Sequence, residues 1–314
     1  IENEFGCFRT ARINLVVSTT IIPINHVFVI EECDNFIDEN DPSNDGFTYF
    51  NFSDNNVSEN AISNLLSFFS TTQQLNVTFY ENEIDALIEE NAIVDITNYR
   101  NNTANSQIIW ARIDSENNNE CFGIGPYVNL VVNPIPELNL GDNFTLCLDP
   151  ITGLGSQIIN ATPSMSGTYD YVWSPANPNG NSPFYDITSA GTYSVIVTNS
   201  DTNCSETDSI TATFSSEPES VFATLLTPAF SIGLSTIEVT AIGGFGIYEY
   251  SLDGIEWQSN PVFIDLPNGS YNIFVRDIQG CGILQTGIIQ TITYNNYFTP
   301  NQDNYNDTWN ISLP

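Results

Sequence analysis

The sequence predicts an all-β protein built from β-sandwiches in tandem, and three observations support this prediction. Aromatic and β-branched residues alternate with polar ones in many short stretches, which is typical of half-buried strands. Cysteine and strand patterns recur along the chain at spacings longer than those of solenoid repeats. Acidic residues number 38 against five arginines and no lysine, giving a net charge of −33, and such self-repulsion favours an elongated array.

The same charge excludes two classes of partner. Nucleic acids and anionic lipids are bound through basic side chains that neutralise phosphate, and this chain has five among 314 residues. No apolar stretch approaches the ~20 residues that a helix needs to cross a bilayer. We therefore expect no nucleic-acid partner and no membrane insertion.

Two pairs of cysteines mark a long repeat. Cys7 and Cys33 are 26 residues apart, as are Cys121 and Cys147, so the repeat period is 114 residues. Each pair encloses a similar apolar run, INLVV in the first and VNLVV in the second. This repeat predicts that 1–23 are the end strands of a preceding repeat and that 24–136 form a complete sandwich.

A shorter repeat follows in the second half of the chain. Tyr193 and Tyr271, 78 residues apart, each come two residues after a glycine and lie in an alternating stretch. A tyrosine at such a corner is typical of immunoglobulin-like sandwiches. The second half therefore divides into an immunoglobulin- or PKD-like sandwich at 137–216 and a further sandwich at 217–293.

Residues 24–136 combine strand patterns with short helical ones. Ile62, Leu65, Leu66 and Phe69 share one helical face, and 84–93 is a second candidate helix. The expected strands of this sandwich lie near 27–30, 47–52, 76–80, 107–113 and 127–132.

The six cysteines include no C-x-x-C pair, which argues for structural disulfides in an oxidising compartment and against zinc or redox sites. We expect one bridge to close each of the first two sandwiches, at a gain of about 4 kcal/mol from loop entropy. The partner of Cys7 is expected upstream, and Cys281 has no mate within its sandwich. The predicted bridges are Cys33–Cys121 and Cys147–Cys204.

Three stretches resemble families of the Bacteroidota. Residues 248–282, YEYSLDGIEWQSNPVFIDLPNGSYNIFVRDIQGCG, resemble the SprB-type repeat of gliding-motility adhesins. Residues 31–132, opening with EECDNFIDENDPSNDGFTYF, are similar to an immunoglobulin-like repeat of large secreted proteins. The stretch FTPNQDNYNDTW at 298–309 resembles the start of the type B C-terminal sorting domain of the type IX secretion system.

This resemblance implies export across the outer membrane to the cell surface. The implied partners are the type IX translocon and its outer-membrane shuttle proteins. Residues 294–314 would be the beginning of the sorting domain, truncated at Pro314, in which Gln302 and Asn304 replace glycines of its acidic turn. The residues that match the sorting motif are Thr299, Pro300, Asn301, Asp303, Asn306, Asp307 and Trp309.

An acidic run at 31–46 predicts a calcium site. Closely spaced carboxylates on a turn suit calcium, which prefers oxygen ligands. Residues 41–46 partly match the start of a calcium loop, although the closing glutamate is missing. A solvated acidic loop is the alternative interpretation. The expected ligands are Asp34, Asp38, Asp41 and Asp45.

Groups suited to catalysis are few. His26 is the only histidine, and its strand-like surroundings favour a packed or edge position. Without lysine or a G-x-S-x-G elbow, Schiff-base, P-loop and serine-hydrolase chemistry are excluded. A carboxylate pair suited to glycoside hydrolysis is expected by chance among so many acidic residues. We expect no enzymatic activity, and no cofactor other than calcium.

These observations together predict a non-catalytic stalk and C-terminal export region of a large cell-surface adhesin. It would serve gliding or surface attachment, with surface polysaccharide as a candidate ligand. One alternative is a spacer or carbohydrate-binding tail of a secreted polysaccharide-degrading enzyme, and another is a sugar-binding, lectin-like fragment in its own right. An upstream hydrolase domain would favour the first alternative, and further repeats would favour the adhesin.

Overall fold

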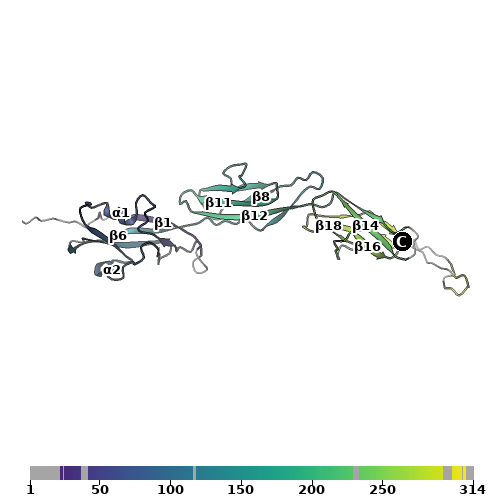
Figure 1. Ribbon diagram of the computed structural model, residues 1–314, viewed down its shortest axis with the longest axis horizontal. Helices are drawn as coiled ribbons and strands as arrows, with labels where there is room; N and C mark the ends of the chain where they lie inside the picture. Colours follow the sequence, from purple (N-terminus) through teal and green to yellow (C-terminus); the bar gives the residue numbers. More distant parts are fainter. Residues whose placement is uncertain are drawn as a thin grey trace, which may run out of the picture. The chain divides into compact units, whose positions relative to one another are not determined.

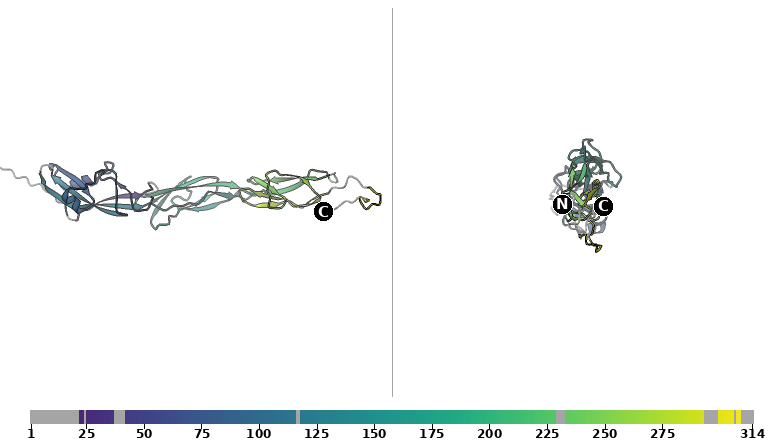
Figure 2. Two further views of the ribbon diagram at one scale, coloured as in Figure 1. Left: turned by 90° about the horizontal axis from the view of Figure 1, so that it is seen from below. Right: turned by 90° about the vertical axis from the view of Figure 1, so that its right-hand side faces the viewer.

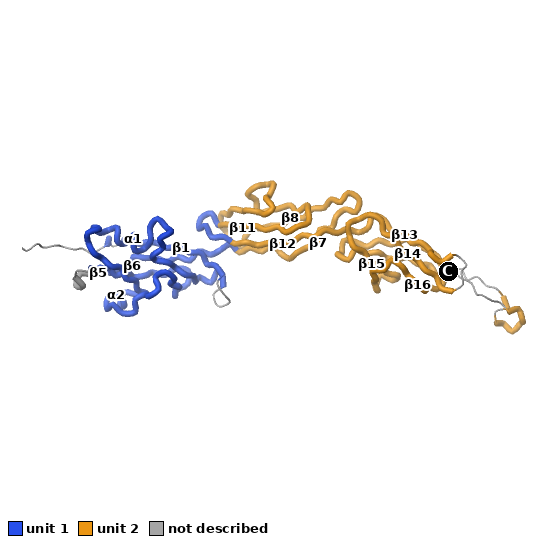
Figure 3. Tube along the Cα trace, in the orientation of Figure 1, with its two compact units in different colours: residues 1–136, 199–205 blue, residues 137–198, 206–314 orange. Residues whose placement is uncertain are grey.

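The computed structural model describes residues 22–23, 25–36, 42–115, 118–228, 233–292, 299–305 and 307–308. Strands dominate these residues, as Figures 1 and 2 show from three directions, and the predicted all-β class is confirmed. The chain divides into two compact units. Unit 1 comprises 1–136 and 199–205, and unit 2 comprises 137–198 and 206–314 (Figure 3).

Unit 1 contains the first sandwich. Its main sheet has the strand order β1-β6-β5-β3, in which β1 runs parallel to β6 and the other pairs are antiparallel. A short antiparallel pair, β2 with β4, forms a second sheet. The strands are β1 (Phe28–Asp34), β2 (Tyr49–Phe50), β3 (Leu75–Tyr80), β4 (Tyr99–Arg100), β5 (Ser106–Ser115) and β6 (Asn118–Pro134).

Two short helices lie within this sandwich, as the sequence predicts: α1 (Ala61–Leu66) and α2 (Glu83–Ile88). Asn60 caps α1, because its side chain accepts a hydrogen bond from the Ser63 N–H while the Ser63 hydroxyl accepts one from the Asn60 N–H. Asn82 caps α2 through its side-chain oxygen, which accepts a hydrogen bond from the N–H of Asp85.

The core of unit 1 follows from strand alternation. Along β5 the buried residues include Ile109, Ala111 and Ile113, and they pack with residues of the neighbouring strands and of α1. Ile22 is also fully buried in this core, so the first sandwich includes a residue that precedes the predicted start at 24. Aromatic contacts join Phe52 to Phe79, with ring centroids 4.9 Å apart.

The second sandwich lies in unit 2 except for 199–205, which group with unit 1. Its main sheet has the order β7-β12-β11-β9, with β7 parallel to β12, and β10 pairs with β8. Its core includes Trp173, whose ring centroid lies 5.1 Å from that of Tyr185. The strands are β7 (Phe144–Cys147), β8 (Gln157–Asn160), β9 (Tyr169–Ser174), β10 (Phe184–Ile187), β11 (Gly191–Asn199) and β12 (Ser205–Ser215).

The third sandwich also lies in unit 2. Its sheets have the orders β13-β14-β16 and β15-β18-β19, and β17 pairs with β20. Ile237, Ile273 and Val275 are fully buried in its core. The strands are β13 (Ser220–Leu225), β14 (Ser235–Ile242), β15 (Tyr248–Ser251), β16 (Val262–Leu266), β17 (Gly269–Tyr271), β18 (Phe274–Asp277), β19 (Ile283–Gln285) and β20 (Ile289–Thr291).

The predicted tyrosine corners are present in both sandwiches of unit 2. The hydroxyl of Tyr193 donates to the carbonyl of Ser189 at 2.6 Å, and that of Tyr271 donates to the carbonyl of Pro267 at 2.8 Å. Both bonds return to the backbone four residues upstream, as in immunoglobulin-like sandwiches. The chain is therefore a tandem of immunoglobulin-like domains. In the part that the structure describes, no helix has the length and apolar character to span a membrane.

Candidate functional site: disulfides between successive sandwiches

Cys33 lies in β1 beside the end of the last strand of its own sandwich. In the parallel β1–β6 ladder Cys33 is paired with Asn133, one residue before β6 ends at Pro134. The Cys33 carbonyl accepts a hydrogen bond of 3.1 Å from the Thr48 hydroxyl. The backbone at Cys33 is therefore held both by the sheet and by the chain that follows β1.

Cys33 is bonded to Cys204, with 5.6 Å between their Cα atoms and 171 residues between them in sequence. Cys204 lies in the loop between β11 and β12. The Asn199 N–H donates to the Cys204 carbonyl at 2.8 Å, which closes this loop. Residues 199–205 group with unit 1 (Figure 3), and Cys204 is only 1% exposed.

The segment after Cys33 is fixed by buried polar contacts. The Asp34 Oδ2 atom accepts a hydrogen bond of 2.6 Å from the Gly46 N–H. The Asn101 amide donates to the Gly46 carbonyl at 2.8 Å, and the Asn44 side chain bonds both the N–H and the carbonyl of Ile135. Gly46 has φ of +87°, a conformation that favours glycine. These contacts hold the backbone at the end of β1, where Cys33 forms its disulfide.

The calcium prediction falls partly outside the described residues, because Asp38 and Asp41 are not among them. Asp34 is 2% exposed, and its Oδ1 atom has no hydrogen-bond partner among the described residues. Burial and the nearby Asp45 carboxylate raise the pKa of Asp34. Within the described ranges, no three His, Cys, Asp or Glu side chains are grouped closely enough to hold a metal ion. Calcium binding by Asp34, Asp38, Asp41 and Asp45 therefore stays a prediction.

The second disulfide repeats the first in unit 2. Cys147 ends β7, where it is paired in parallel with Ser215 at the end of β12. Cys147 is bonded to Cys281, with 5.2 Å between their Cα atoms and 134 residues between them in sequence. Cys281 lies in the loop between β18 and β19. Cys147 is exposed and Cys281 is half-buried, in contrast to Cys204.

A buried aspartate organises the chain around the second disulfide. Asp277 accepts a 2.6 Å hydrogen bond from the Ser215 hydroxyl and a 3.1 Å bond from the Cys281 N–H. Its carboxylate thus joins the end of the second sandwich to the hairpin loop of the third. Gly246 lies so close to Asp277 and to the Ser216 carbonyl that an added Cβ would clash with both.

Both predicted bridges are wrong, and strand geometry gives the reason. Cys33 lies beside the end of β6, whereas Cys121 lies near its beginning. About 12 residues of strand separate Cys121 from Asn133, or roughly 40 Å at ~3.3 Å per residue, while a disulfide needs Cα atoms within about 7 Å. The same argument excludes Cys147–Cys204, because they lie at opposite ends of the second sandwich.

Each observed bond joins the first strand of one sandwich to the last hairpin of the sandwich that follows in sequence. We refer to Cys33–Cys204 and Cys147–Cys281 as the inter-sandwich disulfides. Cys281, expected to have no mate within its sandwich, is bonded to a cysteine outside it. The sequence contains a signal for this arrangement, because Cys204 and Cys281 both follow a corner tyrosine by about ten residues and so occupy equivalent hairpins.

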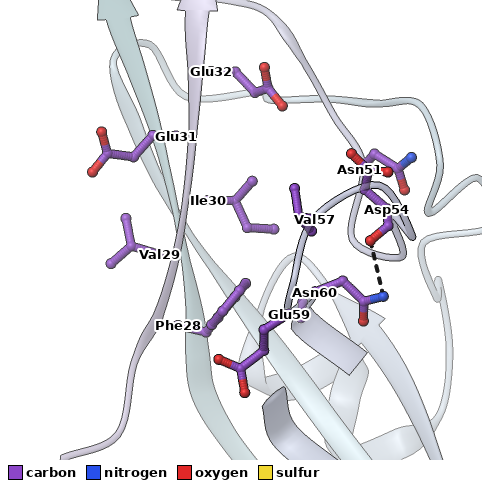
Figure 4. A pocket seen from close by; sticks show the side chains of 11 residues that line it. Phe28, Val29, Ile30, Glu31, Glu32, Asn51, Asp54, Val57, Glu59 and Asn60 are labelled. Atoms are coloured by element: carbon purple, nitrogen blue, oxygen red, sulfur yellow. Dashed lines mark hydrogen bonds between the residues drawn. The ribbon is translucent and has the colours of Figure 1, made fainter. Parts of the chain in front are cut away.

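A groove of about 180 Å³ is lined by residues 28–32 of β1 and by residues of the segment from Asn51 to Ala61 (Figure 4). Phe28 and Ile30 form its apolar wall, and Glu32 lies at its rim. Burial, with the nearby Asp54 carboxylate, raises the pKa of Glu32. The Asn60 amide donates to the Asp54 carbonyl at 3.2 Å. The titratable groups lining this groove are carboxylates, and we assign no reaction to it.

His26 and Trp257 have packing partners. The His26 Nε2 atom lies 2.6 Å from the Asn64 Oδ1 atom, and the His26 ring packs edge-on against Phe68 at 4.5 Å between centroids. The Trp257 ring is covered by the Arg276 guanidinium at 4.1 Å. These contacts agree with the packed position expected for His26.

The described part of the predicted sorting motif forms a turn around Asp307. Its carboxylate accepts hydrogen bonds of 2.7 Å from the N–H groups of Gln302 and Asn304. These two residues have φ of 66° and 65°, the region that glycine adopts readily. The turn therefore forms although both positions lack glycine. Thr299, Pro300, Asn301 and Asp303 are described with Asp307, and Asn306 and Trp309 lie outside the described residues.

One family model matches the part of the chain that contains Cys33, a member of the first inter-sandwich disulfide. Residues 29–136 match the family model described as the Flavobacterium inter-domain disulphide bond domain. This match spans the first sandwich and includes Cys33, whose bond to Cys204 joins two sandwiches. Disulfides of this kind persist in oxidising compartments, so the protein is extracellular or secreted.

Solved structures of low similarity are also matched. Drosophila OTK extracellular domains 3–5 give 10% identity and a TM-score of 0.32, over 70% of this chain and 86% of that one. Titin domains A168–A170 give 11% identity and 0.31, over 69% and 89%. The N-terminal four Ig domains of Dscam1 isoform 4.4 give 15% identity and 0.28, over 60% and 54%. No curated protein sequence matches the chain.

Proposed function

We propose that the chain is a non-catalytic, load-bearing stalk and export region of a cell-surface adhesin of the Bacteroidota, serving gliding or surface attachment. The observation that supports this most strongly is the pair of inter-sandwich disulfides. A bridge within a sandwich would stabilise that sandwich alone. A bridge between sandwiches also changes how tension passes along the chain.

The bond pattern shortens the covalent route for tension. From Cys33 the route crosses to Cys204, runs back along the backbone to Cys147, and crosses to Cys281. This route contains about 57 residues and cannot extend beyond roughly 200 Å at ~3.5 Å per residue. Without the disulfides the same ends are joined by about 248 residues, or roughly 870 Å. The two bonds thus limit how far the protein extends under load.

The acidic composition supports the same role. With a net charge of −33, self-repulsion disfavours compact association of the sandwiches with each other or with other acidic surfaces. The stalk would therefore present an adhesive region, with surface polysaccharide as a candidate ligand. The resemblance of 298–309 to the type B sorting domain supports export by the type IX translocon and outer-membrane shuttle proteins.

Attachment under flow tests the stalk function. Cells displaying the full-length protein are compared with cells carrying Cys33→Ser together with Cys204→Ser, at equal surface abundance. We expect unchanged attachment in still medium and detachment of the variant at lower shear. Equal detachment of both strains would contradict a load-bearing role. Degradation of a polysaccharide by the full-length protein would instead favour the enzyme-tail alternative.

Removal of the predicted sorting residues tests export. Deleting 294–314 and any following residues from the full-length protein is expected to leave it in the periplasm, where fractionation and immunoblotting detect it. A matched deletion of the whole third sandwich, 217–293, keeps the sorting residues and should still reach the surface. Surface display of the first deletion would contradict the export proposal.

A further inference from the structure

The bonded hairpin cysteines lie on the same side of equivalent loops in two sandwiches. Cys204 lies just before β12, and Cys281 lies two residues before β19, so each is on the C-terminal side of the last hairpin loop. Backbone hydrogen bonds from Asn199 to the Cys204 carbonyl and from Asp277 to the Gly282 carbonyl close the two loops, so Cys204 is itself the acceptor and Cys281 lies one residue before the acceptor. We call this place the hairpin position.

Their partners also share one position. Cys33 and Cys147 both lie in a first strand that runs parallel to the last strand of the same sandwich, beside the end of that last strand. We call this place the first-strand position. In both disulfides, the hairpin position of one sandwich is bonded to the first-strand position of the preceding sandwich.

Cys121 also lies on the C-terminal side of the last hairpin loop of its sandwich, as the fourth residue of β6. It lies in β6 directly before Phe122, which pairs with Asp114 across the β5–β6 hairpin, while Ser115 pairs with Asn118 at the turn. This places Cys121 on the C-terminal side of the hairpin loop, as are Cys204 and Cys281. The first sandwich therefore has a cysteine in both positions.

No remaining cysteine of the described residues suits Cys121 as a partner. Cys33 is bonded to Cys204 and Cys147 to Cys281. The third sandwich has no cysteine in its first strand, β13, whose sequence is SVFATL. The 26-residue spacing that relates Cys121 to Cys147 also relates Cys7 to Cys33, so in the sequence repeat Cys7 corresponds to Cys121 and not to Cys33.

We propose that Cys121 forms a third inter-sandwich disulfide, with a cysteine at the first-strand position of a further immunoglobulin-like sandwich N-terminal to residue 1. This inference rests on the proposed stalk and extends it, because the disulfides become a continuous series. In the reaction, the two thiols lose two protons and two electrons and form the S–S bond. A disulfide-containing oxidant accepts them and becomes a dithiol.

Disulfide mapping of the full-length protein tests the proposal. The protein is purified without reductant, blocked with N-ethylmaleimide, and digested with trypsin and endoproteinase Asp-N. Asp142 separates Cys121 from Cys147, and Arg9 and Arg12 separate Cys7 from Cys33. Mass spectrometry then identifies the partner of each cysteine in its own peptide.

We expect the Cys121 peptide to be joined to a peptide from the sequence before residue 1. In the Cys121→Ser variant, that upstream cysteine alone should become reactive to maleimide. A blocked free thiol at Cys121, or a bond from Cys121 to Cys7, would overturn the proposal. The same digest reports the Cys33–Cys204 and Cys147–Cys281 peptides, and only their absence would overturn the proposed stalk.

Discussion

Cys33, in the first strand of one sandwich, is bonded to Cys204, in the last hairpin loop of the next, across 171 residues of sequence. Loop closure on this scale removes entropy worth about 5 kcal/mol from the unfolded chain. The second inter-sandwich disulfide, over 134 residues, repeats the arrangement. The two closed loops, 33–204 and 147–281, overlap in sequence at 147–204.

The two disulfides should differ in their rates of reduction. Access of the attacking thiolate limits the rate, and Cys204 is buried whereas Cys147 is exposed. At low dithiothreitol without denaturant, we expect Cys147 and Cys281 to be labelled first by a maleimide mass tag. The Cys147→Ser, Cys281→Ser double variant should show the slow phase alone. Earlier labelling of Cys33 and Cys204 would contradict this order.

The buried carboxyl of Asp34 should make stability depend on pH. Its pKa is raised by burial, so the folded state holds the proton more tightly than the unfolded state. This tighter proton binding stabilises the folded state at pH values below the unfolded pKa of about 3.9. The stabilisation is lost as pH rises through the higher pKa of the folded state. As pH rises between these two pKa values, the free energy of unfolding of the wild type should therefore fall relative to that of Asp34→Asn. Urea titrations in chelator measure the difference, and a constant difference would contradict the prediction.

Arg112 should stabilise the first sandwich through α2. Its guanidinium is buried, contacts Glu89 at 2.7 Å and Asp114 at 2.9 Å, and donates to the Ala86 carbonyl at 3.1 Å. Arg112→Met should cost roughly 2–3 kcal/mol, because charged hydrogen bonds to buried groups are lost. Hydrogen exchange in β3 and β5 measures the change.

Arg276→Met is the matched control for Arg112→Met. Arg276 pairs with Glu249 at 2.7 Å but is 38% exposed, so its loss should cost about 1 kcal/mol. An equal effect of the two substitutions, each measured in its own sandwich, would show that burial of Arg112 is unimportant.

Calcium should raise the melting temperature of the first sandwich if Asp34, Asp38, Asp41 and Asp45 bind it. The Oδ1 atom of Asp34 has no hydrogen-bond partner among the described residues, and calcium binding to the folded state alone stabilises that state. We expect a rise on adding calcium to chelator-treated protein, and none in Asp34→Asn. Equal melting temperatures with and without calcium would contradict the prediction.

Local patterns in the sequence predict the fold class and several of its elements. Alternation located β5 and β11, the helical face of Leu65 located α1, and the glycine-tyrosine spacing identified the corners at Tyr193 and Tyr271. The two-residue strand β4 was missed, because two residues are too few to show alternation.

The disulfide partners were not predictable from the same patterns. Pairing depends on which end of a sandwich each cysteine occupies, and this follows from the parallel β1–β6 register, which is a tertiary property. Cys33 and Cys121 belong to one sandwich by sequence, yet Cys33 pairs with Asn133 near the end of β6, roughly 40 Å along that strand from Cys121. The calcium and sorting motifs stay predictions because several of their residues, such as Asp38 and Trp309, lie outside the described residues.

Single-molecule pulling tests the load-bearing role most directly. The chain is tethered at its two ends in optical tweezers and fully unfolded, first oxidised and then in dithiothreitol. Reduction should lengthen the unfolded contour by about 190 residues, or roughly 670 Å at ~3.5 Å per residue, because both inter-sandwich disulfides stop shortening the covalent route. An identical contour length before and after reduction would contradict the account.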